Sequence, residues 1–194
     1  VPDYSLIPDR LPNVVVVRSL TKSHAIPGLR LGYLVADAAV VKTLRDFVLP
    51  WSVNSLSQAV GVAALRDEEY LREARLVVQR ERRRLTAALS GMEGLKVYAG
   101  QANFLLVRLQ SGDAAQLARS LLEQGLAIRV CGDFAGLDAR YFRFAVRTEP
   151  ENTRLITALC QNLGGGLGCV ADCPATGHPA AGRAADRRAW PSAT

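Results

Sequence analysis

The sequence contains no hydrophobic run that approaches the roughly 18 residues of a membrane-spanning helix. Its first residues, VPDYSLIPDRLPN, lack the basic, apolar and small-residue regions of a signal peptide and are typical of a loop that leads into a strand. With 49% hydrophobic and 22% charged residues, the composition is ordinary for a globular protein. We therefore expect the 194 residues to form one or two globular domains with a real core.

Cysteine is scarce, and its spacing argues against a disulfide framework or a zinc site. Two of the four cysteines, Cys131 and Cys160, lie in apolar segments and are expected to be buried thiols, which favours a reducing, cytoplasmic compartment. The other two, Cys169 and Cys173, have only His178 beside them as a further candidate ligand. A structural zinc site needs four ligands and usually a CxxC pair. We expect no metal.

Aromatic residues are missing from the most basic run of the chain, RERRR at residues 80–84. Residues 66–84 hold seven arginines mixed with five acidic residues. Their helical spacing predicts a long amphipathic helix with a solvated charged face. The net charge of +6 and the run RERRR would allow phosphate contacts, but no aromatic side chain is interleaved for base stacking. We therefore expect neither nucleic acid nor a membrane as partner.

Helices dominate the middle of the chain. Asp37 is a suitable N-cap for the first of them, which Pro50 ends, and Ser52 or Asn54 is a suitable N-cap for the second. The three helices are expected at residues 38–48, at 56–65 and in the charged run.

After residue 90 the pattern changes to strands that alternate with helices, which predicts an α+β domain. Gly91 and Gly94 mark the break, Gly125 follows one expected helix, and Pro150 stands at the start of the last one. The expected strands are 95–98, 103–109, 126–130 and 141–146, and the expected helices are 113–124 and 151–163. From residue 164 the chain is rich in Gly, Ala and Pro without a period, which predicts a disordered tail.

The stretch 14–35, VVVVRSLTKSHAIPGLRLGYLV, places Lys22 between two strand-forming runs. The first run, 14–17, is continuously apolar and β-branched, like a strand buried on both faces of a parallel sheet. The second run is nearly as apolar. Pro27 and Gly28 provide the turn that folds the second strand back.

Two hydroxyl groups and a guanidinium accompany Lys22. A lysine amine reacts with a carbonyl cofactor only when it is unprotonated, which a partly desolvated site with a cationic neighbour such as Arg30 favours. Ser19, Thr21 and Arg30 are also suited to bind a phosphate. The set indicates a site for a phosphorylated aldehyde. Residue types alone leave open an alternative without a functional site, in which Lys22 is an exposed loop lysine and Arg30 makes a structural ion pair.

The string SLTKSHAIPGLRLGYLV resembles the lysine segment of fold type I pyridoxal phosphate enzymes of the class I/II aminotransferase family. That pattern is a hydroxyl residue, any residue, Ser or Thr, the Schiff-base lysine and then GLRxG. The string is most similar to the histidinol phosphate aminotransferase branch and, within it, to the threonine phosphate decarboxylases of cobalamin biosynthesis. The resemblance implies that Lys22 forms a Schiff base with pyridoxal 5'-phosphate. It also implies that Ser19, Thr21 and Arg30 hold the cofactor phosphate.

Two arginines interrupt apolar strands, Arg129 in LAIRV and Arg143 in YFRFAV. A guanidinium that is buried there needs an anion. The acidic side chains available for an ion pair are Asp133, Asp138 and Glu149. The resemblance of GLDARYFRFAVRTEPEN to the same branch implies instead that Arg129 and Arg143 bind the anionic end of the substrate.

Three further polar residues are weaker candidates. Arg147 lies in the same segment as Arg143, and His24 follows Lys22 by two residues. Asn103 lies in the family-like ANFLLVR and is expected to serve packing or backbone support. We assign no acid or base role to His24.

The resemblance predicts an α/β fold, with residues 1–90 as the C-terminal part of a large cofactor domain (αβα sheet), 91–163 as a small α+β domain and 164–194 as the tail. In the family, the upstream half supplies an aspartate for the pyridine nitrogen, a glycine-rich phosphate loop, an asparagine and a stacking aromatic residue. None of these can be assigned here, so we interpret the chain as the C-terminal part of such an enzyme.

The implied activity is decarboxylation of L-threonine O-3-phosphate to aminopropanol phosphate by a cytoplasmic homodimer. An aminotransferase of the histidinol phosphate type is the first alternative, because the α hydrogen rather than the carboxylate would then be aligned for cleavage. A noncatalytic remnant or dimerising subunit is the second alternative, because the pyridine nitrogen would lack its aspartate.

Overall fold

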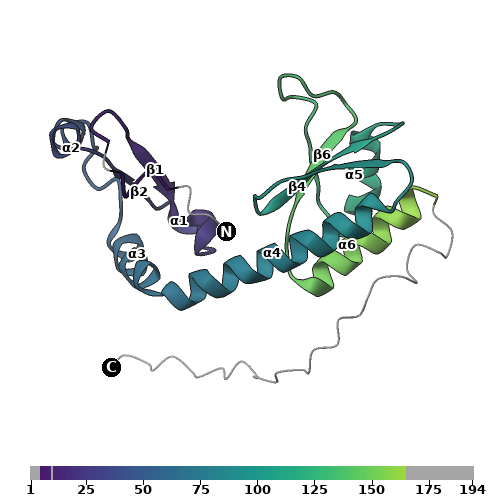
Figure 1. The fold of residues 1–194 in the computed structure, drawn as a ribbon, viewed down its shortest axis with the longest axis horizontal. Coiled ribbons are helices and arrows are strands. Elements are labelled where there is room, and N and C mark those ends of the chain that lie inside the picture. The colour runs from purple at the N-terminus through teal and green to yellow at the C-terminus, as the bar shows by residue number, and fades with distance from the viewer. Residues whose placement is uncertain (1–4, 10, 165–194) are drawn as a thin grey trace. The chain divides into compact units, whose positions relative to one another are not determined.

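The computed structural model describes residues 5–9 and 11–164 (Figure 1). The chain divides into two compact units, each built from three segments. The first unit holds the residues up to 86 together with 99–105 and 144–152, and the second holds 87–98, 106–143 and 153–164. The expected tail, including Cys169, Cys173 and His178, lies outside the described residues, and the domain boundary near residue 90 stays a prediction.

The first unit begins with a two-stranded hairpin, in which β1 (Val16–Ser19) pairs antiparallel with β2 (Gly32–Val35). The predicted strand at 14–17 is shifted by two residues. The expectation of a parallel sheet that buries both faces of this strand is also wrong, because the pairing is antiparallel and the Val17 side chain is 76% exposed. The physical reason is that β1 has only β2 as a strand neighbour within the described residues, so no second strand pairs with it and Val17 is left exposed.

Three helices follow the hairpin as predicted, and their caps explain where they begin. Asp37 Oδ1 accepts a hydrogen bond from Ala39 N at 2.8 Å, and Asn54 Oδ1 accepts one from Ser57 N at 2.8 Å. The first helix ends three residues before the predicted Val48, because the following amides bond to carbonyls three residues back, as in a tightened last turn. The helices are α2 (Ala38–Arg45), α3 (Ser55–Arg66) and α4 (Glu68–Ser90).

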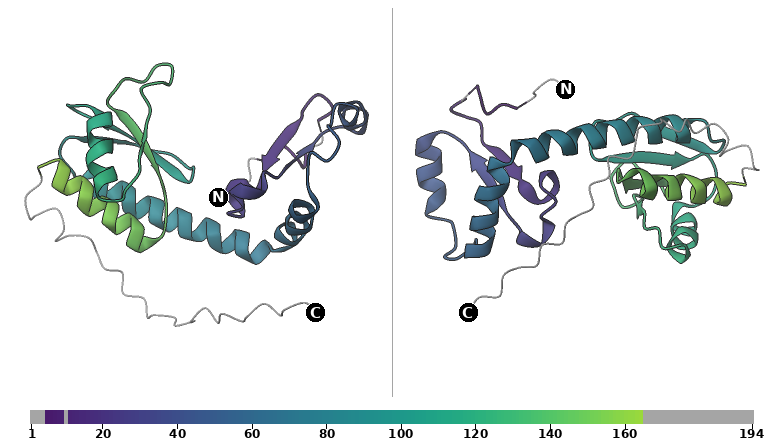
Figure 2. Two further views of the ribbon diagram at one scale, coloured as in Figure 1. Left: turned by 180° about the vertical axis from the view of Figure 1, so that it is seen from behind. Right: turned by 90° about the horizontal axis from the view of Figure 1, so that it is seen from below.

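A four-stranded sheet with the order β3-β4-β6-β5 follows α4. The side chains of Val107, Leu121 and Phe142 are fully buried and form part of the core. Helix α5 lies beside this sheet (Figure 2). The strand predicted over 126–130 forms ladder pairs at only two residues. The strands are β3 (Leu95–Tyr98), β4 (Phe104–Leu109), β5 (Arg129–Val130) and β6 (Tyr141–Ala145), and the helices are α5 (Ala114–Glu123) and α6 (Glu149–Asn162).

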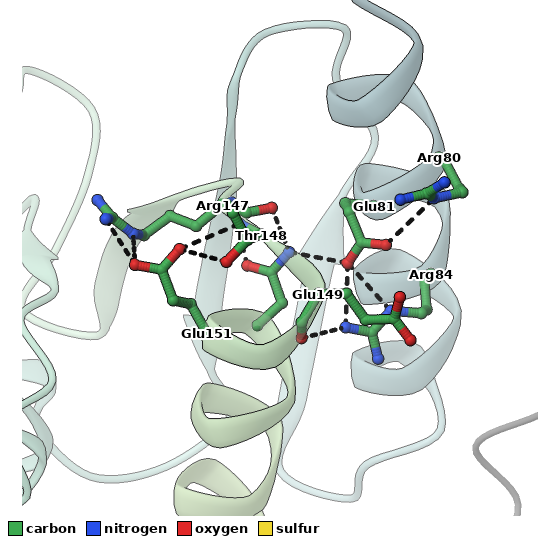
Figure 3. Close-up of polar contacts among 8 residues, drawn as sticks. Arg80, Glu81, Arg84, Arg147, Thr148, Glu149 and Glu151 are labelled. Carbon is green, nitrogen blue, oxygen red and sulfur yellow. Dashed lines mark hydrogen bonds and ion pairs between the residues drawn. The ribbon is translucent and has the colours of Figure 1, made fainter. Parts of the chain in front are cut away.

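One acidic side chain of α4 is buried, contrary to the expectation that the charged run is a solvated face. Glu81 is 1% exposed and accepts hydrogen bonds from Asn152 Nδ2 and Arg84 Nη2, each at 3.0 Å (Figure 3). Burial raises the pKa of the Glu81 carboxyl, but these hydrogen bonds and the charges of Arg84 and Arg80 outweigh it, so the pKa lies below its usual value. Glu81 therefore stays ionised and holds the start of α6 against α4.

The two cysteines within the described part of the chain, Cys131 and Cys160, are buried and not joined in a disulfide, as predicted. No group of three or more His, Cys, Asp or Glu side chains suited to a metal ion occurs among residues 5–9 and 11–164. Over the same residues, none of the helices has both the length and the apolar character needed to cross a bilayer.

Candidate active site

The predicted lysine segment forms the connection between β1 and β2. Ser19 ends β1 and caps the one-turn helix α1 (Leu20–Ser23), since its Oγ accepts a hydrogen bond from Thr21 N at 3.4 Å. The hydroxyl oxygens of Ser19 and Thr21 lie 2.9 Å apart. The structure therefore brings together the two hydroxyls that the sequence selected as phosphate ligands, with Lys22 as the next residue along the turn.

Arg30 follows the short 3-10 helix η1 (Pro27–Leu29) and directs the chain into β2. Its φ is 51°, a left-handed conformation that is uncommon outside glycine, and its Nη1 donates a hydrogen bond to Pro27 O at 3.0 Å. The turn fixes Arg30 between the two strands, as the motif requires. The bond to Pro27 takes one of its five N–H donors, and the other donors suit a phosphate.

Ser57, which the sequence reading did not select, supports this turn from α3. Its side chain is 1% exposed, and its Oγ donates a hydrogen bond to Leu29 O at 3.0 Å. The bond joins the third residue of α3 to the residue directly before Arg30. A serine three residues after the Asn54 cap, at the start of an otherwise apolar helix, is the sequence signal that could have drawn attention to it.

The Lys22 side chain is exposed, so the described residues alone do not desolvate its amine. His24 is engaged elsewhere, since its Nδ1 lies 2.9 Å from Ser23 Oγ and its ring stacks on Tyr70 with 6.2 Å between the ring centroids. We therefore still assign no catalytic role to His24. The residues present fit pyridoxal phosphate in their donor chemistry, because an amine, two adjacent hydroxyls and a guanidinium lie on one connection.

The two predicted substrate-binding arginines face each other across the β5–β6 ladder, where Arg129 and Arg143 are Cα partners. Both guanidinium groups lie over the Phe134 ring, at 5.7 and 5.6 Å from its centroid. Arg129 also forms an ion pair with Asp133, the partner that residue types alone suggested. The expected burial is wrong for Arg129, whose side chain is 54% exposed, because β5 is a two-residue edge strand.

The lysine segment belongs to the first unit and the arginine pair to the second. Arg147 is paired with Glu151, whose Oε1 accepts a hydrogen bond from Arg147 Nε at 2.7 Å. Asn103 provides backbone support, since its carbonyl accepts a hydrogen bond from Val146 N at 2.8 Å. We keep Arg147 as a weaker candidate on the sequence alone, since an ion pair with a neighbouring carboxylate is present at Arg129 as well.

Comparison with known proteins covers most of the described chain. Residues 6–159 match the family model described as aminotransferase class I and II. The threonine-phosphate decarboxylase of Salmonella typhimurium is 44% identical over 155 residues, which are 79% of this chain and 42% of that protein. The chain thus spans less than half the length of this relative.

Solved structures share the fold. The histidinol-phosphate aminotransferase from Clostridium acetobutylicum matches with a TM-score of 0.77 and 29% identity, over 83% of this chain and 48% of that one. The histidinol-phosphate aminotransferase from Sinorhizobium meliloti in complex with pyridoxal-5'-phosphate matches with a TM-score of 0.67 and 26% identity, over 79% and 42%. The family model matches well over half of the length of the chain. The chain therefore belongs to the class I and II aminotransferase family of pyridoxal phosphate-dependent enzymes.

Proposed function

We propose that this chain is part of a pyridoxal phosphate-dependent decarboxylase that converts L-threonine O-3-phosphate to aminopropanol phosphate in cobalamin biosynthesis. The observation that carries the proposal is the 44% identity to a threonine-phosphate decarboxylase over 155 residues. That aligned length is 79% of this chain, although it is only 42% of the relative. The activity proposed is therefore that of the whole enzyme to which such a chain contributes.

In this proposal each part of the site has a separate task. Lys22 carries the cofactor through its amine, and Ser19, Thr21 and Arg30 bind the cofactor phosphate. When bound, pyridoxal phosphate supplies an electron sink for the bond that breaks at the substrate α carbon. Arg129 and Arg143 bind the anionic end of the substrate and so orient the bond to be cleaved.

The first test asks whether Lys22 holds the cofactor. The chain is incubated with pyridoxal phosphate and reduced with borohydride, and the covalent label is mapped by peptide mass spectrometry. The chain has only three lysines, Lys22, Lys42 and Lys96, so the assignment is unambiguous. We expect label on Lys22, its loss in Lys22→Arg and its retention in the matched control Lys42→Arg, which changes an exposed lysine of α2. Label on all three lysines alike, or none on Lys22, contradicts a specific site.

The second test separates decarboxylase from aminotransferase. Threonine phosphate is supplied to the cofactor-loaded protein with and without a 2-oxoacid, and both carbon dioxide and the amino acid formed from the 2-oxoacid are measured. We expect carbon dioxide without the 2-oxoacid. Amino transfer to the 2-oxoacid without release of carbon dioxide favours the histidinol phosphate type of aminotransferase, the candidate supported by the TM-score of 0.77 to the Clostridium acetobutylicum structure. Specific Lys22 label without either reaction favours a cofactor-binding but noncatalytic chain.

We further propose that the enzyme works in the cytoplasm as a homodimer. The buried cysteines Cys131 and Cys160, which form no disulfide, support a reducing compartment. Exposed apolar side chains after α2, among them Trp51 at 96% exposure, support a protein surface that is covered by another chain. Light scattering during size exclusion measures the assembly directly, and a monomeric mass at micromolar concentration contradicts the dimer.

A further inference from the structure

The arginine pair on β5 and β6 places two like charges directly opposite each other. Arg129 and Arg143 are Cα partners in an antiparallel ladder, so their side chains leave the same face of the sheet. Like charges in this relation are destabilising. The pair therefore needs a source of negative potential even when no substrate is bound.

Two consecutive residues after β5 provide that potential. The Asp133 carboxylate pairs with Arg129 Nη2, and the Phe134 ring presents its π face to both guanidinium groups at 5.6 to 5.7 Å. The Phe134 side chain is part of the protein, so it stays beside the arginines when the substrate leaves. It also does not compete with the substrate for the N–H donors of the arginines. The Asp133 carboxylate, in contrast, accepts a hydrogen bond from Arg129 Nη2, a donor that is also suited to a bound anion.

We propose that Asp133 is an internal counter-ion that competes with the anionic group of the ligand for Arg129 and thereby limits how tightly this site holds phosphate. The proposal rests on the function proposed above, in which Arg129 and Arg143 bind the anionic end of the substrate, and it takes that end to be the phosphate group. The product of that reaction keeps its phosphate. When the Asp133 carboxylate pairs with Arg129 again, it favours release of the product. Tighter binding by the arginines that is equal for substrate and product does not accelerate the reaction.

The exposure of the pair sets the size of the effect. The Arg129 and Asp133 side chains are 54% and 60% exposed, and exposed ion pairs of this kind contribute about 0.2–1 kcal/mol. Converted to a binding constant, the upper part of that range corresponds to a change of about two- to fivefold. Because both charges face solvent, salt should weaken their pairing strongly.

The experiment measures binding of inorganic phosphate by the ¹⁵N-labelled chain near pH 7.5, from the amide shifts of β5 and β6. We expect Asp133→Asn to bind phosphate about two- to fivefold more tightly than the unmodified chain at low ionic strength, with the gain shrinking in 0.5 M sodium chloride. Glu123→Gln removes the same charge from the exposed end of α5 and is the matched control, with unchanged affinity expected. Asp133→Ser, which also lacks the charge, should reproduce the gain.

Each outcome decides between the inference and the function beneath it. If the unmodified chain binds phosphate and Arg129→Gln abolishes binding, but Asp133→Asn binds no more tightly, the counter-ion role is overturned and the arginine assignment stands. If Arg129→Gln binds like the unmodified chain, or no phosphate binds near β5 and β6, the phosphate assignment of the arginines fails and the counter-ion role fails with it. Thermal unfolding of every variant confirms that the exposed substitutions leave the fold intact.

Discussion

Asn152 donates a hydrogen bond from Nδ2 to Oε2 of Glu81 at 3.0 Å, across 71 positions of the sequence (Figure 3). The same Nδ2 donates to the carbonyl of Arg147 at 2.8 Å, and Asn152 Oδ1 accepts from Arg147 N at 3.1 Å. The amide side chain of Asn152 thus provides hydrogen-bond partners both for the backbone that follows β6 and for a buried carboxylate of α4. The segment after β6 is held to α4 by polar groups rather than by apolar packing alone.

The first prediction concerns Glu81. Glu81→Gln keeps the size of the side chain but removes the negative charge beside Arg84, whose side chain is only 17% exposed. We expect the free energy of unfolding to fall by about 1–3 kcal/mol, because a buried charged hydrogen-bond partner is lost. Urea unfolding followed by circular dichroism measures the change. Glu69→Gln, on the same helix but 64% exposed and paired with Arg72, is the control, with a change within about 0.5 kcal/mol. If the two variants lose equal amounts of unfolding free energy, the buried charge of Glu81 does not stabilise the fold.

The second prediction is a loss of stability in acid. Hydrogen bonds from Arg140 lower the pKa of Asp138 to about 2, and hydrogen bonds from Arg147 and Thr148 lower that of Glu151 to about 2. Since both pKa values are lowered on folding, the unfolded chain binds more protons in acid. Their contribution is fully present above the pKa of the unfolded chain, about 4, and is lost as the pH falls toward 2.

We therefore expect the free energy of unfolding to be level near neutral pH and to decrease from about pH 5 to pH 2. Glu151→Gln imitates the protonated side chain, so its stability should lie below that of the unmodified chain at pH 7 and approach it near pH 2. A difference between the two chains that is constant over this range contradicts the assignment of the acid effect to Glu151. Denaturant unfolding at a series of pH values provides the measurement.

The third prediction tests the support of the cofactor turn by α3. Ser57→Ala removes the donor to Leu29 O and leaves that carbonyl without this partner, at an expected cost of about 1–2 kcal/mol. Because Leu29 directly precedes Arg30, we also expect less pyridoxal phosphate label on Lys22 at limiting cofactor. Ser55→Ala, on the exposed first residue of the same helix, should change stability by no more than about 0.5 kcal/mol and leave the label unchanged. Identical labelling in both variants would mean that Ser57 acts on stability alone.

Local signals in the sequence were sufficient for several parts of this structure. The cap Asp37, the cap Asn54 as one of two candidates with Ser52, and the end of α4 at Ser90 are encoded within a few residues of where they act, so they could be predicted. The hydroxyl pair beside Lys22 could be predicted for the same reason, because the motif is continuous in the chain.

Features that depend on distant partners could not be predicted. Glu81 has the same local surroundings as the solvated acids of its helix, but it is buried and bonded to Asn152 of α6, a partner that only the fold brings to it. Arg129 follows an apolar run, which suggests burial, yet β5 is an edge strand of two residues and leaves the guanidinium exposed. The apolar run that includes Val17 likewise predicted a covered strand, whereas coverage depends on neighbouring strands that the local sequence does not specify.

The last prediction explains the final glycine of the GLRxG pattern. Gly32 pairs with Ser19 across the hairpin, and a Cβ added at Gly32 would lie 2.6 Å from the carbonyl oxygen of Arg18. A backbone oxygen cannot move aside as a flexible side chain can, so β1 and β2 must separate locally in Gly32→Ala. We expect a loss of about 1–3 kcal/mol in unfolding free energy, as for other overpacked sites, together with weaker cofactor labelling of Lys22.

Gly28→Ala is the matched control, since it changes another glycine of the same motif. A Cβ at Gly28 meets no atom within 4 Å, and the residue does not have a left-handed backbone. We therefore expect its stability to be unchanged or to rise by up to about 1 kcal/mol, because alanine restricts the unfolded chain more than glycine does. Thermal and urea unfolding give the stabilities, and borohydride labelling gives the cofactor occupancy. If both substitutions are equally well tolerated, close approach of the two strands is not what the motif requires at Gly32, and a role in the cofactor site itself must account for that glycine.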